Sequence, residues 1–448
     1  MTKKLNPWNH ATLYVVLRVF GARVGFLNTL LIARLLGSRE YGLMSLAFAA
    51  ATLLATLAGL GLPYWITREV SISQQANQRR RLFNISRQTL QLCLLVSLLP
   101  ATITAISYAL LRTRLPTTFP FVVPASVVFL AAALIPLVSL NQIRAAIIRG
   151  LGHALTADFP DMVVRPLSIS LAIGVALLLT AHYDAALGMT VQVCGTAISF
   201  SVGAVLLWKS MKTAIYNSGG LGEPTPSDYI RTKSLLREAP HFLLILLIAT
   251  MDGQLSIYII GFISGPSNVG IYQVALQPLN IILMGLIAVG AYAQPRIAAT
   301  WAKRERSSTQ EVINHATTFS SRVALIFGIA LILLATPIIQ LYGSSYSNAA
   351  TLLRILAIGQ IIHGITGPIG IVMLMTGNQK KLFYFDLLFL LLKIVMLSLA
   401  VHYFGLLGAA LAEVIYLLIM RLTGAAFVRR HTGLVTTLWR RPRLTNPT

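Results

Sequence analysis

Long apolar runs recur from one end of the chain to the other, separated by short polar stretches. A helix rises 1.5 Å per residue, so about 20 residues cross a hydrocarbon core roughly 30 Å thick. The runs predict twelve membrane-spanning helices, at 12-34, 42-66, 88-111, 120-147, 162-181, 186-208, 239-263, 269-294, 318-341, 351-375, 382-403 and 406-428. The ten-residue alternating segments of a membrane β-barrel are absent. We therefore predict an all-α polytopic membrane protein.

The apolar pattern also contains an internal repeat. Gly-Ser-Arg-Glu-Tyr-Gly-Leu-Met at 37-44 reappears as Gly-Pro-Ser-Asn-Val-Gly-Ile-Tyr at 265-272, each between two long apolar runs. Three weaker matches follow in the same order: Pro63 with Pro295, Gly150 with Gly377, and Gly188 with Gly408. Glycine is common in membrane helices, so the shared order matters more than any one match. Two similar bundles around a central cavity are typical of transporters, whose halves rock about a site between them.

The repeat and a change in composition predict the domains. The stretch at 209-238 is rich in Gly, Pro, Ser and Thr, which is typical of a flexible linker. It lies between the sixth and seventh predicted spans. We expect an N-terminal six-helix bundle at 1-208, a cytoplasmic linker at 209-238, a C-terminal six-helix bundle at 239-430 and a basic cytoplasmic tail at 431-448.

Composition and charge agree with a membrane protein. The chain is 56% hydrophobic and 11% charged, with a formal net charge of +23. Such a charge can indicate a nucleic-acid partner, but here Lys and Arg alternate between loops. One set of loops is strongly basic and includes Arg144, Arg149 and Arg165; the opposite set holds only Arg34, Arg39, Arg112, Arg114 and Arg354. Short basic loops stay in the cytoplasm and lie against anionic lipid, so we predict cytoplasmic termini, lipid contacts and no nucleic-acid partner.

The two cysteines provide no metal or disulfide framework. Cys93 and Cys194 both lie inside apolar runs, so we predict neither a metal site nor a cofactor. The first apolar run follows a short basic start, but it is too long for a signal peptide and contains two arginines. We interpret it as a retained membrane helix.

Specific residues in both halves carry a family resemblance. They are the segments 33-42, 59-63 and 68-70 in the first half, and Asp252, Gly261, 270-272 and Ala275 in the second. With these residues the chain resembles the bacterial O-antigen and exopolysaccharide flippases of the multidrug/oligosaccharidyl-lipid/polysaccharide exporter superfamily. The resemblance implies two six-helix bundles around a cavity, in the bacterial cytoplasmic membrane. It also implies a polyprenyl-pyrophosphate-linked oligosaccharide as cargo, carried from the inner to the outer leaflet by alternating access, and contacts with other polysaccharide-assembly proteins.

Two arginines in the first span are candidate substrate ligands. Ionisable groups are costly inside a membrane and are functional candidates by default. Arg pairs bidentately with phosphate oxygens and stays charged, which suits a diphosphate. Arg23 lies deep in the span, whereas Arg18 is shallow enough to snorkel to the inner headgroups. A structural ion pair is the alternative for Arg23.

The remaining candidates are polar groups on later spans. Asp252, near the middle of the seventh span, fits three roles: a partner for Arg18 and Arg23, a site for a coupling proton or sodium ion, or a pair needed only for folding. Lys393 and Glu413 lie at similar depths on consecutive spans and are expected to meet, as a structural pair or as gating and coupling groups. Polar groups that form interhelical hydrogen bonds or line a glycan path are Gln254, Gln273, Gln277, Asn280, Gln360 and His363.

Two other classes of function compete with a flippase. A multidrug and toxin extrusion antiporter shares the double bundle, but a cationic cargo favours an acidic cavity, whereas the first span holds two Arg. A membrane glycan polymerase or ligase needs catalytic groups in a sizeable outer loop. The longest outer connection, about 111-119, holds neither a carboxylate nor a His. We therefore predict a transporter and not an enzyme.

Overall fold

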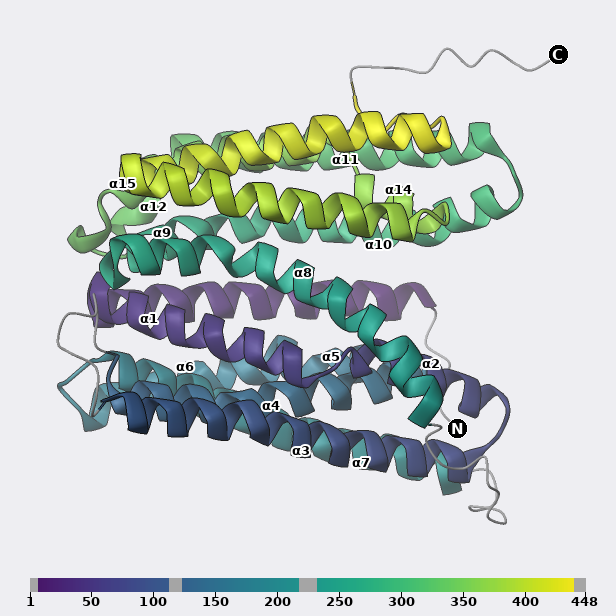
Figure 1. The fold of residues 1–448 in the computed structure, drawn as a ribbon, viewed down its shortest axis with the longest axis horizontal. Helices are drawn as coiled ribbons and strands as arrows, with labels where there is room; N and C mark the ends of the chain where they lie inside the picture. Colours follow the sequence, from purple (N-terminus) through teal and green to yellow (C-terminus); the bar gives the residue numbers. More distant parts are fainter. Residues whose placement is uncertain (1–6, 113–122, 217–231, 439–448) are drawn as a thin grey trace. The chain divides into compact units, whose positions relative to one another are not determined.

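The computed structural model describes residues 7–112, 123–216 and 232–438. Within them the chain is helical almost throughout (Figure 1). The helices of the first half are α1 (Pro7–Ala58), α2 (Leu62–Gln75), α3 (Arg79–Arg112), α4 (Ala125–Gly150), α5 (Ala154–Phe159), the π-helical turn η1 (Pro160–Val164), α6 (Arg165–Leu179) and α7 (Ala185–Tyr216).

The second half follows a similar order. Its helices are α8 (Thr232–Ser264), α9 (Pro266–Leu276), the 3₁₀ turn η3 (Gln277–Leu279), α10 (Asn280–Ala302), α11 (Arg306–Leu333), α12 (Ala335–Gln340), the 3₁₀ turn η4 (Ser344–Tyr346), α13 (Ala349–Thr366), α14 (Ile369–Met375) and α15 (Gln379–Thr432). The chain forms two compact units. Unit 1 comprises Met1–Leu36 and Leu43–Gln254, and unit 2 comprises Gly37–Gly42 and Leu255–Thr448.

Ten helices of the described residues are long and apolar enough to span a membrane. Two of them each contain two predicted spans. In α1 the backbone is non-helical at Gly37 (φ 73°, ψ 174°), and in α15 it is non-helical at Gly405 (φ 58°, ψ −140°). Positive φ is readily adopted by glycine alone, so these residues allow each break. The predicted all-α polytopic membrane class is confirmed.

The repeated motif has the same backbone conformation in both copies. Gly265, before α9, has φ 83° and ψ 173°, close to the values at Gly37. Within unit 2 the two copies also contact each other reciprocally. A Cβ atom on Gly42 would lie 1.8 Å from the carbonyl oxygen of Pro266, and one on Gly270 would lie 2.0 Å from that of Ser38. Both contacts therefore need a residue without a side chain.

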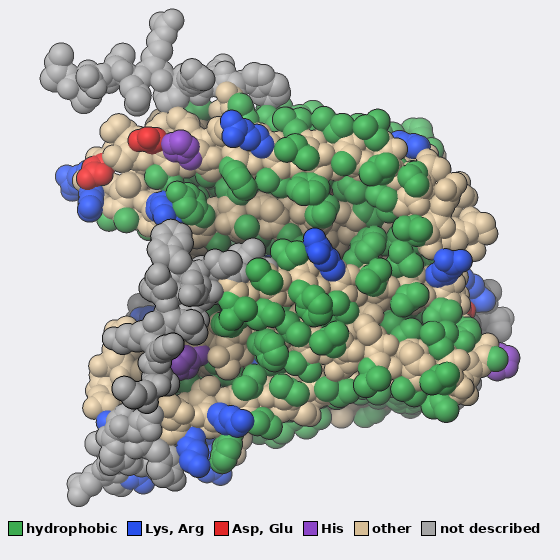
Figure 2. All heavy atoms as spheres, turned by 180° about the vertical axis from the view of Figure 1, so that it is seen from behind, with side chains coloured by type: hydrophobic (Ala, Val, Ile, Leu, Met, Phe, Trp, Pro, Cys, Tyr) green, Lys and Arg blue, Asp and Glu red, His purple; other side chains and the backbone are tan. Residues whose placement is uncertain are grey.

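Each unit has its own apolar core. In unit 1, Trp65 and Ile66 of α2 pack with Ile85 of α3 and Ile143 and Ile147 of α4. In unit 2, residues of α10, α11, α14 and α15 form the corresponding core, which includes Ala293, Ile313, Val372 and Val428. Hydrophobic side chains are also exposed over much of the face in Figure 2. Such a surface suits contact with lipid acyl chains.

Several predicted boundaries differ from the structure. The fifth span was predicted to begin at 162, but α5 begins at Ala154 and continues through η1 into α6. Two carboxylates interrupt the apolar run there, which hid the start of the helix. The second span was predicted at 42-66, but the helix ends earlier. In the structure α1 stops at Ala58, and α2 starts at Leu62 after a turn.

The predicted linker and tail are only partly described. Residues 209–216 continue α7 and residues 232–238 belong to α8, while 217–231 lie outside the described residues, as do 113–122 of the outer connection. The start of the predicted tail is packed against unit 2. Leu434 is buried, and the side-chain amide of Gln310 donates to the carbonyl of Val435 at 2.7 Å and accepts from its N–H at 2.8 Å. Residues 439–448 lie outside the described part.

Candidate functional site

The predicted arginines of the first span have different surroundings. Arg18 is half-buried and lies within electrostatic range of Tyr14, whose hydroxyl donates to Asp158 Oδ2 at 2.8 Å. Arg149 Nη1 donates to the other oxygen of this carboxylate, also at 2.8 Å. This network links α1 to α4 and α5. Arg23 is exposed and lies further along α1.

The other predicted ligands are half-buried. Asp252 and Gln254 lie in α8, and Gln277 opens the turn η3, where its Oε1 accepts from Asn280 Nδ2 at 3.3 Å. The functional roles of Arg18, Arg23, Asp252, Gln254 and Gln277 remain predictions.

Lys393 and Glu413 do meet, as their depths predicted. Lys393 Nζ lies 3.0 Å from Glu413 Oε1, and the two side chains are 5% and 16% exposed. Ser256 of α8 donates to the second carboxylate oxygen at 3.0 Å, and the ammonium lies 5.0 Å from the ring centroid of Tyr416. The pair therefore joins α8 to both arms of α15 inside unit 2. Its predicted coupling or gating role remains a prediction.

A second polar cluster, in unit 1, centres on Arg144 of α4. Its side chain is 0% exposed, whereas that of its partner Asp161 is 38% exposed. The guanidinium donates to Asn141 Oδ1 at 2.8 Å, to the carbonyl of Ala157 at 3.2 Å and to Asp161 Oδ2 at 3.2 Å. Asp161 also accepts from Asn141 Nδ2, and from Ser199 of α7 at 2.9 Å. We call these residues the Arg144 cluster.

Local backbone features make room for this cluster. A Cβ atom on Gly203 of α7 would lie 2.4 Å from Arg144 Nε, so a bare backbone is needed there. The π-helical turn at Pro160–Val164 contains Asp161 and shifts the side-chain register between α5 and α6. Such turns are rare and frequent at functional sites. Assigning Arg144 to a basic loop was therefore wrong: its charge is held inside the bundle by Asp161.

Arg165, also assigned to a basic loop, begins α6. Its guanidinium lies 5.6 Å from the ring centroid of Phe48, and its Nη2 donates to Gln192 Oε1 at 3.4 Å. Its Nε is buried and finds no hydrogen-bond acceptor among the described residues. Arg144 and Arg165 thus both lie within electrostatic range of Asp161, and Arg144 lies also within range of Asp158.

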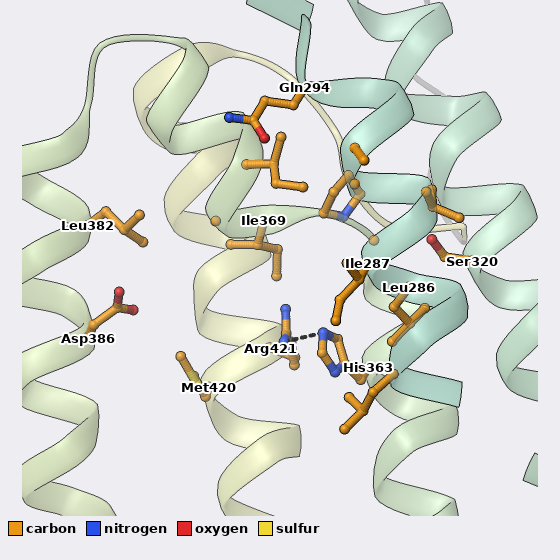
Figure 3. A pocket seen from close by; sticks show the side chains of 18 of the residues that line it. Leu286, Ile287, Gln294, Ser320, His363, Ile369, Leu382, Asp386, Met420 and Arg421 are labelled. Carbon is orange, nitrogen blue, oxygen red and sulfur yellow. Dashed lines mark hydrogen bonds between the residues drawn. The ribbon is translucent and has the colours of Figure 1, made fainter. Parts of the chain in front are cut away.

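Unit 2 contains a cavity of about 500 Å³, lined by α10, α11, α13, α14 and α15. Figure 3 shows Asp386 and Arg421, from the two arms of α15, and His363 of α13 pointing into it. Arg421 Nη2 contacts His363 Nε2, while Arg421 Nε is buried without an acceptor among the described residues. The lining is otherwise mostly apolar, with Gln294 and Ser320 as further polar side chains. We call it the His363 cavity.

The sequence prediction missed most of these groups. Asp386 and Arg421 fall inside the spans predicted at 382-403 and 406-428, so their presence in apolar runs was a usable signal. Asp161 was missed because the fifth span was started one residue after it. His363 was noted only as a polar group. Among the described residues, no group of three or more His, Cys, Asp or Glu is arranged to hold a metal ion.

The fold is that of membrane transporters of the MOP superfamily, the multidrug/oligosaccharidyl-lipid/polysaccharide exporters. An inward-facing multidrug resistance MATE family transporter is similar over 93% of this chain and 97% of its own, with a TM-score of 0.71 and 13% identity. The lipid II flippase MurJ, in an inward closed conformation, is similar over 93% of this chain and 87% of its own, with a TM-score of 0.64 and 15% identity. A MOP superfamily transporter from Pyrococcus furiosus, described as having a binding pocket of reverse polarity, is similar over 93% of this chain and 93% of its own. Its TM-score is 0.64 and its identity is 13%.

The sequence itself identifies the family. The profile of the polysaccharide biosynthesis protein family matches residues 8–301, and the MatE profile matches residues 241–399. The chain belongs to the polysaccharide biosynthesis protein family, and the predicted resemblance is confirmed. No curated protein sequence matches the chain.

Proposed function

We propose that this transporter is a flippase for a polyprenyl-pyrophosphate-linked oligosaccharide. It moves this lipid from the inner to the outer leaflet of a bacterial cytoplasmic membrane for polysaccharide biosynthesis, with both termini in the cytoplasm. The observation that carries the proposal is the polysaccharide biosynthesis match over residues 8–301. The similarity of the fold to a lipid II flippase supports it.

The charges of unit 1 also favour an anionic cargo. Arg144 and Arg165 both lie within electrostatic range of Asp161, Arg144 lies also within range of Asp158, and Arg23 adds an exposed cation on α1. A site rich in guanidinium groups attracts diphosphate and repels a cationic drug. Arg18 and Arg23 would bind the diphosphate, while Asp252, Gln254 and Gln277 would contact the rest of the polar head. The lipid tail can remain in the bilayer.

A drug or cation antiporter is the second candidate. The MatE match over residues 241–399 and the similarity to multidrug resistance MATE transporters favour it. Such a protein would carry cationic compounds in exchange for protons or sodium ions. The two candidates predict opposite charge for the cargo, so a transport assay separates them.

The test is flipping in reconstituted vesicles, using a panel of fluorescent polyprenyl-pyrophosphate-linked sugars whose outer-leaflet fraction is measured by chemical quenching. We expect the wild-type protein to flip at least one of them. Arg23→Ala is expected to lower the rate about 10-fold or more, because a charge-assisted contact to a diphosphate contributes about 1.5–3 kcal/mol. Arg34→Ala, at another exposed arginine of α1, is the matched control.

The outcomes assign both the function and the residue. A rate for Arg23→Ala equal to that of Arg34→Ala would remove Arg23 from the mechanism. A wild-type protein that flips none of the sugars but exports ethidium would replace the flippase with the antiporter. Comparable expression of both variants shows that folding is not the cause.

A further inference from the structure

The segment that follows α15, residues 433–438, lies against a break between two helices of unit 2. α13 ends at Thr366, and α14 begins at Ile369 after Gly367 and Pro368. Gly367 has φ 72°, a backbone conformation outside the helical region. Regular helical hydrogen bonding therefore stops at this point of the chain. We call residues 433–438 the strap and the position at Gly367 the helix break.

Two side chains of α11 bind the backbone of the strap. Gln310 accepts from the N–H of Val435 at 2.8 Å and donates to its carbonyl at 2.7 Å. One helical stretch further along α11, Thr317 Oγ1 donates to the carbonyl of Thr436 at 2.9 Å. Leu434 of the strap is buried in the apolar core that α10, α11, α14 and α15 form. The strap is therefore seated inside unit 2 and fixed to α11.

The strap also contacts the helix break itself. The N–H of Leu438 donates to the carbonyl of Ile365 in the last turn of α13, at 3.4 Å. The last carbonyls of a helix have no partner within the helix, and within a membrane the protein must supply one. A Cβ atom on Gly367 would lie 2.5 Å from the carbonyl oxygen of Thr436 and closer still to Thr317 Oγ1. A change of angle at Gly367 therefore disturbs the hydrogen bond that fixes the strap to α11.

The seat of the strap is incompletely satisfied. Thr436 is 1% exposed, and its Oγ1 finds no hydrogen-bond partner among the described residues. A buried hydroxyl without a partner is unfavourable, and it gains hydrogen bonds when it reaches water. The bond from Leu438 is longer than the usual range of about 2.7–3.2 Å. A few hydrogen bonds thus hold the strap while one buried group opposes them, which suits a contact that opens and closes.

The internal repeat does not require the helix break. Gly367 lies ten residues before Gly377, and Leu140 lies ten residues before Gly150, the match of Gly377 in the first half. Leu140 lies inside α4, which is one continuous helix from Ala125 to Gly150. The break is therefore a feature of unit 2, and the strap that contacts it belongs to the same unit.

From this geometry we propose that the strap is a latch of unit 2. While it is seated, it holds α13 and α14 at one angle, and its release allows the two helices to bend at Gly367 during the transport cycle. Gly367, Pro368 and Ile369 line the His363 cavity, so bending at this point changes the shape of that cavity. The inference goes beyond the proposed function, because the latch does not depend on which cargo is carried.

The first test does not depend on transport. Amide hydrogen exchange is measured by mass spectrometry on the full-length protein in nanodiscs, with peptides that cover 433–438 and 365–370. In the wild-type protein we expect both segments to exchange faster than the buried part of α11, because the latch opens without global unfolding. Thr317→Val removes one bond to the strap and keeps the size of the side chain. It should raise exchange in both segments about fivefold, the effect of one net hydrogen bond on an equilibrium. Gln310→Met, which removes the bonds to Val435, should act in the same direction.

Thr309→Val is the matched control. Thr309 is also buried on α11, but its hydroxyl contacts Thr300 and the carbonyl of Glu305 and not the strap. Two results of the exchange test overturn the inference. A strap that exchanges as slowly as the buried part of α11 in the wild-type protein would be a fixed part of the core. Exchange at 365–370 that is the same in Thr317→Val and in Thr309→Val would show that the strap does not hold the helix break.

The second test uses the flipping assay. We expect Thr317→Val to raise the maximal flipping rate by up to about fivefold, because a weaker latch opens more often. The sugar concentration at half-maximal rate should stay the same, since no contact to the cargo changes, and Thr309→Val should flip at the wild-type rate. An unchanged or lower maximal rate for Thr317→Val overturns the role of the latch in transport but leaves the flippase intact. If the wild-type protein flips no sugar, the flippase fails, and the exchange test still decides whether the strap opens.

Discussion

Arg144 of unit 1 and Arg421 of unit 2 are held in different ways. Arg144 in unit 1 is 0% exposed, and its guanidinium donates to Asn141, Ala157 and Asp161. Arg421 in unit 2 borders a cavity of about 500 Å³ and contacts the imidazole of His363. The first arrangement fixes the side chain, because every movement would break hydrogen bonds in a filled interior. The second borders open space, so the side chain of Arg421 has room on one side.

The strongest way to break this comparison is to remove the carboxylate beside each arginine. Asp161→Ala leaves a fully buried guanidinium without its counter-ion, and we expect it to lower the free energy of unfolding in detergent by about 3–5 kcal/mol. Asp386→Ala is the matched variant in unit 2. It is expected to lower the free energy of unfolding by about 1 kcal/mol or less, because the cavity can hold water around Arg421. Equal losses would show that both arginines are held alike.

The buried ion pair of unit 2 is a check on this reasoning. Lys393 is 5% exposed and pairs with Glu413, so Lys393→Met should leave an uncompensated carboxylate and lower the free energy of unfolding by about 3 kcal/mol. The double variant Lys393→Met, Glu413→Leu removes both charges and should recover most of the loss. A double variant as unstable as the single one would mean that packing, and not charge, sets the effect.

A smaller effect on the free energy of unfolding is expected when a methyl group is added beside the Arg144 cluster or in the His363 cavity. Gly203→Ala places a Cβ atom 2.4 Å from Arg144 Nε, and the forced shift should cost about 1–3 kcal/mol in free energy of unfolding. Gly370 of α14 lines the His363 cavity and has no atom within 4 Å of a Cβ position. Gly370→Ala should therefore be neutral, or stabilising by up to about 1 kcal/mol through helix propensity. Thermal unfolding of both variants measures the difference, and a stable Gly203→Ala protein would contradict a filled unit 1.

The sequence predicted the features that depend on local pattern. Apolar length located the spans, and the repeated glycines marked Gly37 and Gly265, whose backbone conformations nearly coincide. The meeting of Lys393 and Glu413 was also predictable, because the two residues lie at similar depths on either side of a short turn. Each of these predictions depends only on the spacing of residues along one helix or two consecutive helices.

Contacts between distant helices were not predictable in the same way. Asp161 binds Asn141 of α4 and Ser199 of α7, and no spacing in the sequence indicates that these three residues meet. Charged residues also shorten an apolar run, so the rule that located the spans placed Asp161 outside the membrane. The His363 cavity depends on the packing of five helices. The sequence showed His363 and Arg421 in apolar runs but not that they share one space.

The most direct measurement of the central claim is a competition between two kinds of cargo in the same vesicles. Wild-type protein is reconstituted once, and the flipping of polyprenyl-pyrophosphate-linked sugars is compared with the export of ethidium. We predict flipping of at least one sugar, with no ethidium export above protein-free vesicles. Export of ethidium without flipping of any sugar would contradict an anionic lipid-linked saccharide as the cargo.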